Sequence, residues 1–473
     1  MALLRVGIAL TLLLDLALRA RSLRAHYTDF GVLPRATTLA DGSPAVFFLP
    51  SLHSLSGDWP LQAVLFTVAG GCAVFLALGR FTRTATMASW LLLVSLHHRN
   101  PMVTHGDDTL LACVLFFGML LPWGARYSLD ARSVPARQTE RSGTAPTRFL
   151  SFATAGYAVQ VALVYLFSAL LKTGPEWWSE GSAVAYALSS GNAYAWVAVA
   201  QDFPGLLALL SRGVMALEFA APLLLFSPIW TAPLRMVGIV GIVAFHLGIA
   251  STLALGIFPV VGIVTTLGLI PSVCWTWLGV DRGATEAPTQ LEDSFPGRLR
   301  NGVALGALAL IVGWNLTTLP RAPFAFSPGI VKLGAWLRLG QSWSMFAPGP
   351  SRESGWHVVA GRLDDGSTVD VLRGGERVDW ARPPRIATVY PSFRWYEYLA
   401  RTTGPEAGTH QELYAAYLCR AWNETQPETR HLRTLELVYL WSDIRPGAPL
   451  DRPERRTLRI HRCRPALPVN AGV

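Results

Sequence analysis

Long apolar stretches separated by short polar loops dominate the first two thirds of the chain. A helix needs about 20 mostly apolar residues to cross the hydrocarbon core of a bilayer. By this criterion the sequence predicts about nine membrane-spanning helices, near residues 2–20, 61–80, 84–98, 107–124, 147–171, 203–227, 231–252, 254–279 and 300–318. The first stretch contains Asp15 and no small-residue cleavage site follows it, so we interpret it as a span and not as a signal peptide. We therefore expect an all-α polytopic membrane bundle over residues 1–320.

The pattern changes after about residue 333. HVVAGRLDDGSTVDVLRGG (357–375) predicts a hairpin with Asp-Gly at the turn, and RTLELVYLW and RTLRIHRCR predict further strands. FRWYEYLART and HQELYAAYLCRAWNE have helical spacing. We expect a small C-terminal extramembrane α+β domain over residues 333–473. The joining segment QSWSMFAPGP (341–350) is rich in aromatic residues, and we expect it to anchor at the membrane interface.

Composition supports the assignment to the membrane. Hydrophobic residues make up 51% of the 473 residues and charged residues only 15%, which is too apolar for an ordinary soluble enzyme. The net charge of +9 does not indicate a nucleic-acid partner, because no pattern of basic and aromatic recognition residues accompanies it. The expected partner is the lipid bilayer.

The distribution of arginine predicts the orientation. With an odd number of spans and a cytoplasmic N-terminus, most arginine-bearing loops fall on the cytoplasmic side of the cell membrane. These arginines are Arg80, Arg83, Arg126, Arg132, Arg137, Arg141, Arg148, Arg235, Arg282, Arg298 and Arg300. The C-terminal domain then lies outside. Four arginines after the first span break the pattern: Arg19, Arg21, Arg24 and Arg35.

The five cysteines form no CxxC pair, so the sequence indicates neither a zinc ribbon nor a dithiol redox site. Only Cys419 and Cys463 share the polar C-terminal part. They can form a disulfide if that part lies outside the cytosol.

A lysine ends the fifth predicted span, in YLFSALLKTGPEWWSEG (165–181). The chain contains only two lysines, Lys172 and Lys332, among 40 basic residues. In one interpretation Lys172 extends to the interface, where Trp177 and Trp178 form an aromatic belt. Arginine would serve that purpose equally well, whereas only lysine can lose its proton in a poorly solvated site and act as a base. Both interpretations stay open at this point.

Histidines and carboxylates surround the loop between the third and fourth predicted spans. They are His97, His98, His105, Asp107 and Asp108. Their spacing matches no zinc-binding pattern, so we predict no metal site. Asp107 or Asp108 is instead expected to cap the fourth span, which would place a carboxylate near its outer end.

Two further ionisable residues occur within predicted spans. His246 is either a hydrogen-bonded core residue or part of a site, and Glu218 is expected to pair with a helix donor or with Arg212. Ionisable groups in spans are costly and by default face a cavity, a partner or a pathway. Lys172, His246 and the carboxylates before the fourth span all fall near the outer face. Together they predict a constellation for proton abstraction.

Four ordered motifs resemble the HTTM family, the membrane-domain family that includes vitamin K-dependent gamma-glutamyl carboxylase. They are RVGIALTLLLDLALRARSLRAHYTDFGVLP, RNPMVTHGDDTLLACVLFFGMLLPWGARYSLDA, LFSALLKTGPEWWSEG and FHLGIASTLALGIFP. The third matches the segment that carries the carboxylase's catalytic lysine five residues before a tryptophan, here Lys172 and Trp177. The fourth resembles the family's histidine followed by a Gly-x-Phe-Pro turn, here His246. The resemblance covers roughly residues 1–320.

The resemblance implies an enzyme that uses reduced vitamin K or another naphthohydroquinone. In the carboxylase, the oxygenated quinone takes a proton from the γ-carbon of a glutamyl side chain, and the carbanion captures CO₂. By analogy Lys172 is the base that starts the oxygenation, and His246 binds or orients an intermediate. We expect the pocket also to contain His105, Asp107, Trp177 and Glu218. The implied partners are a lipid-soluble quinone and a peptide or protein glutamyl substrate.

Two departures from the carboxylase pattern leave a second function open. A further histidine of the carboxylase falls at Asp107 here, with His105 nearby but out of register. The C-terminal part is also short for the carboxylase's lumenal domain. The alternative is a non-enzymatic HTTM receptor, immunity factor or maturation factor, in which the polar residues only hold helices together. A transporter is disfavoured, because the sequence shows no inverted repeat.

Overall fold

Helices form most of the chain before residue 337, in line with the apolar pattern of the sequence. The structure, a computed structural model, describes residues 1–40, 51–133, 151–280, 295–447 and 452–463. The longer helices are α1 (Ala2–Ala20), α4 (Trp59–Leu78), α5 (Thr82–Arg99), α6 (Gly106–Gly118), α9 (Phe152–Leu171), α11 (Pro204–Phe226), α12 (Thr231–Thr252) and α15 (Phe295–Thr317). The shorter helices are α2 (Leu23–Tyr27), α3 (Arg35–Ala40), α7 (Leu129–Arg132), α10 (Ala183–Leu188), α13 (Phe258–Val264), α14 (Ser272–Trp277) and α16 (Pro328–Trp336).

Five helices among the described residues are long and apolar enough to cross a membrane, namely α4, α9, α11, α12 and α15. The other predicted spans take different forms: α1 and α5 are more polar, and α6 has only 13 residues. The prediction of one helix over 254–279 is wrong. There α13 and α14 are separate helices, and Pro271, which lacks a backbone N–H, immediately precedes α14. Residues 147–150 of the fifth predicted span, and Arg137, Arg141, Arg148 and Arg282, lie outside the described residues.

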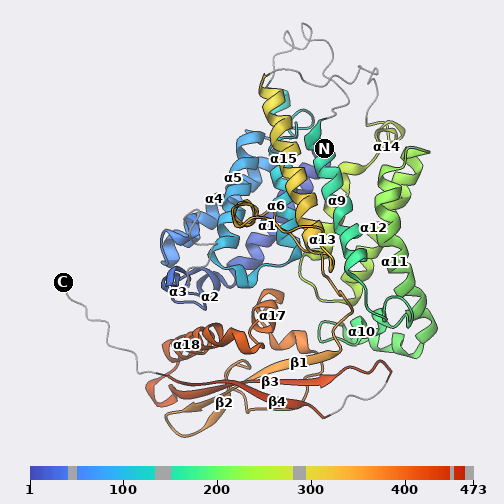
Figure 1. Cartoon of the computed structure of the whole chain (residues 1–473). Helices are drawn as coiled ribbons and strands as arrows, with labels where there is room; N and C mark the ends of the chain where they lie inside the picture. Colours follow the sequence, from blue (N-terminus) through green and yellow to red (C-terminus); the bar gives the residue numbers. More distant parts are fainter. Residues whose placement is uncertain (41–50, 134–150, 281–294, 448–451, 464–473) are drawn as a thin grey trace, which may run out of the picture.

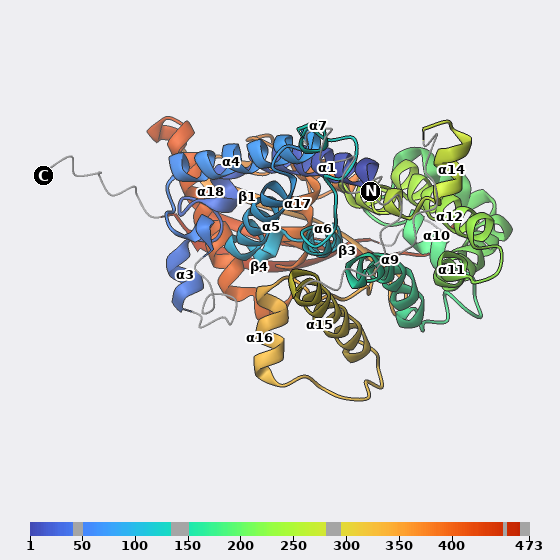
Figure 2. The same cartoon turned by 90° about the horizontal axis from the view of Figure 1, so that it is seen from above.

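Local signals set the ends of the spans. α4 ends at Gly79, which adopts the left-handed conformation with φ of 68°. Ser151 caps α9, because its hydroxyl accepts from the Thr154 N–H while the Thr154 hydroxyl accepts from the Ser151 N–H. In the most apolar stretch of α9, 61% of the residues are buried, against 28% or less in the other four candidate spans. α9 is therefore the central helix, in contact with α6, α11 and α15 (Figure 2).

The C-terminal part forms a four-stranded antiparallel sheet with helices, as its sequence pattern predicts. The strands are β1 (Glu353–Leu363), β2 (Thr368–Asp370), β3 (Leu432–Asp443) and β4 (Glu454–Arg462), in the order β2-β1-β3-β4. The predicted Asp-Gly turn joins β1 to β2, and Gly366 has a φ of 83° there. Helices α17 (Phe393–Ala400) and α18 (Gly408–Thr425) lie between the sheet and the bundle (Figure 1).

One hydrophobic core runs through the seam between bundle and sheet. It includes Tyr27 and Val103 from the bundle together with Trp395, Tyr398 and Leu437 from the C-terminal part. All five are at most 6% exposed. The burial of aromatic and aliphatic surface thus holds the two parts together.

Four side chains form a buried charge cluster across the same seam: Asp15, Arg19, Asp108 and Arg394. Arg394 of α17 donates to Asp15 of α1 at 2.6 Å and to Asp108 of α6 at 2.8 Å. Arg19 also donates to both aspartates. Asp15, Arg19 and Asp108 are each 1% exposed. Because a buried charge without a partner is costly, the arginine from α17 is needed to balance the aspartates.

Local ion pairs account for three of the four arginines that break the predicted charge pattern. Arg19 belongs to the buried charge cluster. Arg24 pairs with Glu424 at 2.7 Å, and Arg35 pairs with Asp29 at 2.8 Å. These arginines serve contacts within the fold, so their number is a poor guide to the orientation of the first span.

Arg80 and Arg126 lie in segments at the end of the bundle that is far from the C-terminal sheet. Arg5, at the start of α1, donates to the carbonyls of Trp123 and Tyr127, and Asp130 accepts from the backbone of Phe81 at the start of α5. The start of α1 therefore shares one end with the α4–α5 turn and with the segment around residues 123–130. That end lies away from the sheet (Figure 1). Arg80 and Arg126 are in these segments.

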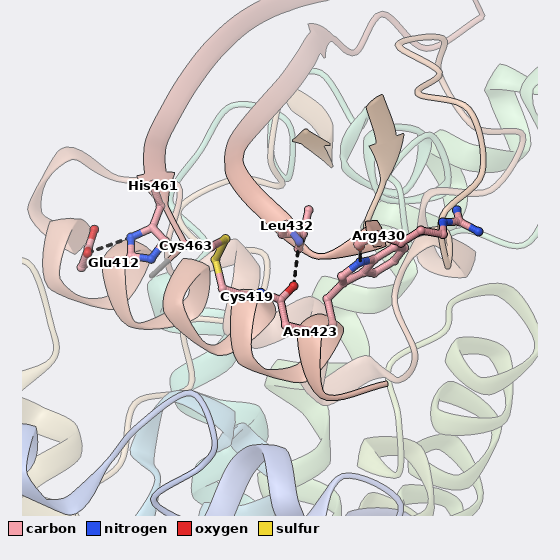
Figure 3. The surroundings of a disulfide bond; sticks show 8 residues. Glu412, Cys419, Asn423, Arg430, Leu432, His461 and Cys463 are labelled. Carbon is pink, nitrogen blue, oxygen red and sulfur yellow. Dashed lines mark hydrogen bonds and ion pairs between the residues drawn. A yellow bond between two sulfur atoms is a disulfide. The ribbon is translucent and has the colours of Figure 1, made fainter. Parts of the chain in front are cut away.

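A disulfide joins Cys419 of α18 to Cys463, just after β4 (Figure 3). Beside it, Glu412 lies 2.9 Å from Nδ1 of His461. Cys72, Cys113 and Cys274 are free. The two cysteines of the C-terminal part are therefore bonded to each other and fasten a helix to the last strand.

The buried charge cluster predicts a large stability loss on removal of its C-terminal member. Arg394→Ala removes one of the two cations that pair with Asp15 and Asp108. We therefore expect the free energy of unfolding to fall by about 3–5 kcal/mol. Arg433→Ala is the matched control, since Arg433 is 66% exposed in its pair with Asp364 and should cost less than about 1 kcal/mol. Thermal unfolding in detergent measures both, and equal losses would contradict the assigned role of the cluster.

Candidate functional site

A cavity of about 420 Å³ lies between α9, α11 and α12, closed on one side by the segment that leads to the sheet. Its walls are mostly aliphatic and aromatic. They include Val164, Val184, Leu188, Val214, Ile249 and Phe258. Polar side chains reach the cavity at only a few positions, as is typical of a small-molecule site of this size.

Lys172 and Glu218 form a buried ion pair in the wall of the cavity. Lys172 Nζ lies 2.7 Å from both carboxylate oxygens of Glu218 and 2.5 Å from the hydroxyl of Ser168. Ser168 donates to Glu218 at 3.1 Å. Lys172 follows the last residue of α9, four residues after Ser168, which brings the two side chains to the same side of the helix. The three groups thus form a closed hydrogen-bonded triangle against an apolar space.

Of the two interpretations of Lys172, the one that extends its side chain to the interface is wrong, because that side chain is only 2% exposed. The expectation for Glu218 offered a helix donor or Arg212, and the structure has the first: Ser168 of α9 and Lys172 at its end both donate to the carboxylate. Arg212 is exposed and is not the partner. Six residues along a helix correspond to a rotation of about 240°, so Arg212 points away from the face that carries Glu218.

His246 lies in the same wall, on α12, and is 1% exposed. Its Nε2 lies 3.0 Å from the hydroxyl of Tyr165. Tyr165 belongs to α9 and lies seven residues, about two helical turns, before Lys172. Nδ1 of His246 has no hydrogen-bond partner among the described residues. A buried ring nitrogen in that state is available to a ligand in the cavity.

His105 reaches the cavity from the residue before α6. Its Nδ1 lies 3.0 Å from Asp107, which is 4% exposed and does not itself line the cavity. The N-cap residue of α6 is His105, and Asp108, three residues later, accepts a hydrogen bond from the His105 N–H at 2.8 Å as part of a capping box. An aspartate therefore stabilises the start of this helix, but not from the N-cap position. Burial lowers the pKa of His105, but the hydrogen bond to Asp107 and the nearby carboxylates outweigh it, and the net pKa is raised above 6.5.

Trp177 and the segment 341–350 close the cavity. The Trp177 ring lies 5.1 Å from Lys172 Nζ, and its indole N–H donates to the carbonyl of Phe346 at 2.9 Å. Met345 and Phe346 line the cavity, and Trp343 is fully buried. The segment expected to anchor at the interface is thus a wall of the cavity. Trp178 differs from Trp177 in being 54% exposed.

The cavity is lined by five of the six residues that the sequence analysis assigns to the pocket. His105, Lys172, Trp177, Glu218 and His246 line it, and Asp107 contacts it through His105. Sequence reasoning missed Tyr165 and Ser168. Their spacing of seven and four residues before Lys172 was the available signal, because it places all three on one helical face.

The histidines and aspartates around α6 do not converge on one point. His97 contacts Asp108 at 3.3 Å, whereas the His98 ring lies 3.1 Å from the carbonyl of Trp336. In the part of the chain that the structure describes, no group of three or more potential metal ligands is assembled.

These features define a multi-pass helical membrane protein with an apolar cavity that contains a buried lysine–glutamate pair. The HTTM domain matches residues 39–275, which is half of the chain, so the protein belongs to the HTTM family. The match covers Lys172, Glu218 and His246 and stops before the C-terminal sheet. No curated protein and no solved structure matches the chain.

The buried pair predicts strong coupling between its two members. Lys172→Met and Glu218→Leu should each destabilise the protein by about 3–5 kcal/mol, because each leaves a polar partner unmatched in an apolar wall. The double variant should lose clearly less than the sum, since it leaves neither charge behind. Thermal unfolding of all four proteins measures the coupling, and additive losses would show that the two groups do not depend on each other.

Proposed function

We propose that the protein is a membrane enzyme that binds a naphthohydroquinone in the cavity and oxidises it with O₂, with Lys172 as the base. The observation that carries the proposal is the Lys172–Glu218 pair, buried in the wall of an apolar cavity. A structural anchor for a helix end does not require this arrangement. A buried pair contributes little net stability compared with apolar residues of the same volume, so its presence favours a chemical role.

The cavity residues fit a flat, apolar ring system with oxygens at its edges. The volume of about 420 Å³ falls within the usual range for small-molecule sites. Lys172 would face one polar edge of such a ligand, and Nδ1 of His246, which no described residue bonds, would face another. When bound, the hydroquinone supplies the electrons for the reduction of O₂.

Some residues that line the cavity are also exposed on the outer surface of the bundle, which would face lipid. Leu210 of α11 is 45% exposed, and Ala244 and Gly248 of α12 are exposed although they line the cavity. These residues lie on two of the candidate spans. A lipid-soluble ligand would therefore enter between α11 and α12 without crossing water.

Glu218 gives Lys172 a route to the neutral state that a base requires. Transfer of one proton from Nζ to the carboxylate, across 2.7 Å, leaves both groups uncharged, which an apolar wall tolerates better than an ion pair. The amine can then accept a proton from a hydroxyl of the ligand. Ser168 bonds to both members and keeps them in register. Arginine cannot replace Lys172 here because it does not lose its proton.

The family resemblance extends the proposal to the acceptor. Vitamin K-dependent gamma-glutamyl carboxylase couples oxygenation to CO₂ fixation on a glutamyl side chain, and we propose the same class of peptide or protein substrate for this chain. The C-terminal part would lie outside the cell membrane and the N-terminus in the cytoplasm. The Cys419–Cys463 disulfide and the position of Arg80 and Arg126 away from the sheet support this orientation.

The proposal predicts turnover that depends on Lys172. Purified protein is supplied with 2-methyl-1,4-naphthohydroquinone, O₂, labelled bicarbonate and a glutamate-rich peptide, and both quinone epoxide and fixed label are followed. We expect Lys172→Arg to lower epoxide formation by at least about 100-fold, as loss of a general base does. Lys332→Arg, at the other lysine of the chain, is the control and should keep wild-type turnover.

The products separate the possible functions. Epoxide without fixed label would establish an oxygenating enzyme that does not carboxylate this peptide. Epoxide formed equally by wild type and Lys172→Arg would remove Lys172 as the base. If folded wild-type protein forms neither product, the non-enzymatic receptor or maturation factor becomes the better account.

A further inference from the structure

The side chain of His105 is held between two aromatic rings from different parts of the chain. Its ring centroid lies 5.8 Å from Phe258 of α13 and 5.2 Å from Phe393 of α17, both in edge-to-face arrangements. Gly256 leaves room for the Phe393 ring, because a Cβ at this position would lie only 2.8 Å from it. The C-terminal part thus helps to fix a residue of the cavity.

One edge of the His105 ring is committed and the other is not. Nδ1 is bonded to Asp107, which also lies 3.9 Å from Arg394 of the buried charge cluster. No described residue forms a hydrogen bond with Nε2. Because Asp107 does not line the cavity, the edge that carries Nε2 is the one left for a ligand. A carboxylate behind an imidazole in this way fixes the ring and favours its protonated form.

We propose that His105 is the anion-binding residue of the cavity, positioned by Asp107 and by α17 of the C-terminal part. The ligand chemistry that it fits is an aromatic oxyanion, the conjugate base of the hydroxyl that Lys172 deprotonates. This inference rests on the proposed function. Lys172 takes the proton, and His105 donates a hydrogen bond from Nε2 to a negatively charged oxygen.

The charges around His105 set the pH range of this role. Asp107 and Asp108 on α6 and Glu397 on α17 favour the imidazolium. Arg394 on α17 is the nearby cation, 3.9 Å from Asp107. The pKa of His105 is raised above 6.5. The charged form is therefore favoured at low pH and is lost as pH rises through a pKa that lies above 6.5. Anion binding should follow the same curve.

Two probes of similar size test the inference: neutral 2-methyl-1,4-naphthoquinone and 2-hydroxy-3-methyl-1,4-naphthoquinone, an enol acid that is ionised throughout the pH range used. Their dissociation constants are measured by titration of the full-length protein between pH 6.5 and 9. We expect affinity for the anionic probe to fall about tenfold across this range, the size of a charge-assisted hydrogen bond, with no change for the neutral probe. His105→Gln should weaken the anionic probe about tenfold at pH 6.5 and abolish the pH dependence.

Variants around His105 separate positioning from direct contact. Asp107→Asn and, from α17, Glu397→Gln should each move the midpoint of the pH dependence to lower pH without changing affinity for the neutral probe. His98→Gln is the matched control, since His98 bonds to the Trp336 carbonyl and does not line the cavity, and it should behave as wild type.

The outcomes distinguish this inference from the proposed function. If the neutral probe binds while the anionic probe shows no pH dependence, or keeps it in His105→Gln, His105 is not the anion-binding residue and the quinone cavity stands. If Asp107→Asn and Glu397→Gln leave the midpoint of the pH dependence unchanged, the positioning role of Asp107 and α17 is overturned. If neither probe binds to folded protein, the quinone ligand itself is wrong, and the role of His105 fails with it.

Discussion

The ion pairs of Arg394 with Asp15 and Asp108 are the contact on which the arrangement of the site depends. Arg19 of the bundle supplies one positive charge for the two buried aspartates, and α17 supplies the second from the C-terminal part. This contact holds α17 against the bundle, and α17 in turn places Phe393 on His105. The cavity is therefore a product of both parts of the chain, although its Lys172–Glu218 pair belongs to the bundle alone.

The Lys172–Glu218 pair shows how a cost in stability can be tied to function. Two apolar residues would fill the same space with less desolvation, so the fold alone does not explain the pair. A site that must hold a proton and release it can use such a pair. The adjoining apolar cavity can hold the ligand whose hydroxyl exchanges that proton with Lys172. Membership of the HTTM family agrees with this reading but does not select the reaction.

Much of the fold could be predicted from the sequence, because helix and strand periodicities are local. The ends of α11 and α12 and the hairpin at Gly366 fall where expected. The apolar stretch over residues 254–279 led to the wrong prediction of one long helix, because a hydropathy average does not detect the helix break at Pro271. In the site, Lys172 and His246 could be singled out as unusual polar residues in apolar stretches. Their partners Glu218 and Tyr165 could not be paired from sequence, since helix rotation and packing decide which faces meet.

The measurement that tests the central claim most directly is a structure of the protein in lipid nanodiscs with a bound naphthoquinone. The account predicts density for the ring inside the cavity, with one oxygen near Lys172 and any tail leaving between α11 and α12. A ring bound elsewhere, with the Lys172–Glu218 pair facing only lipid or empty space, would contradict it.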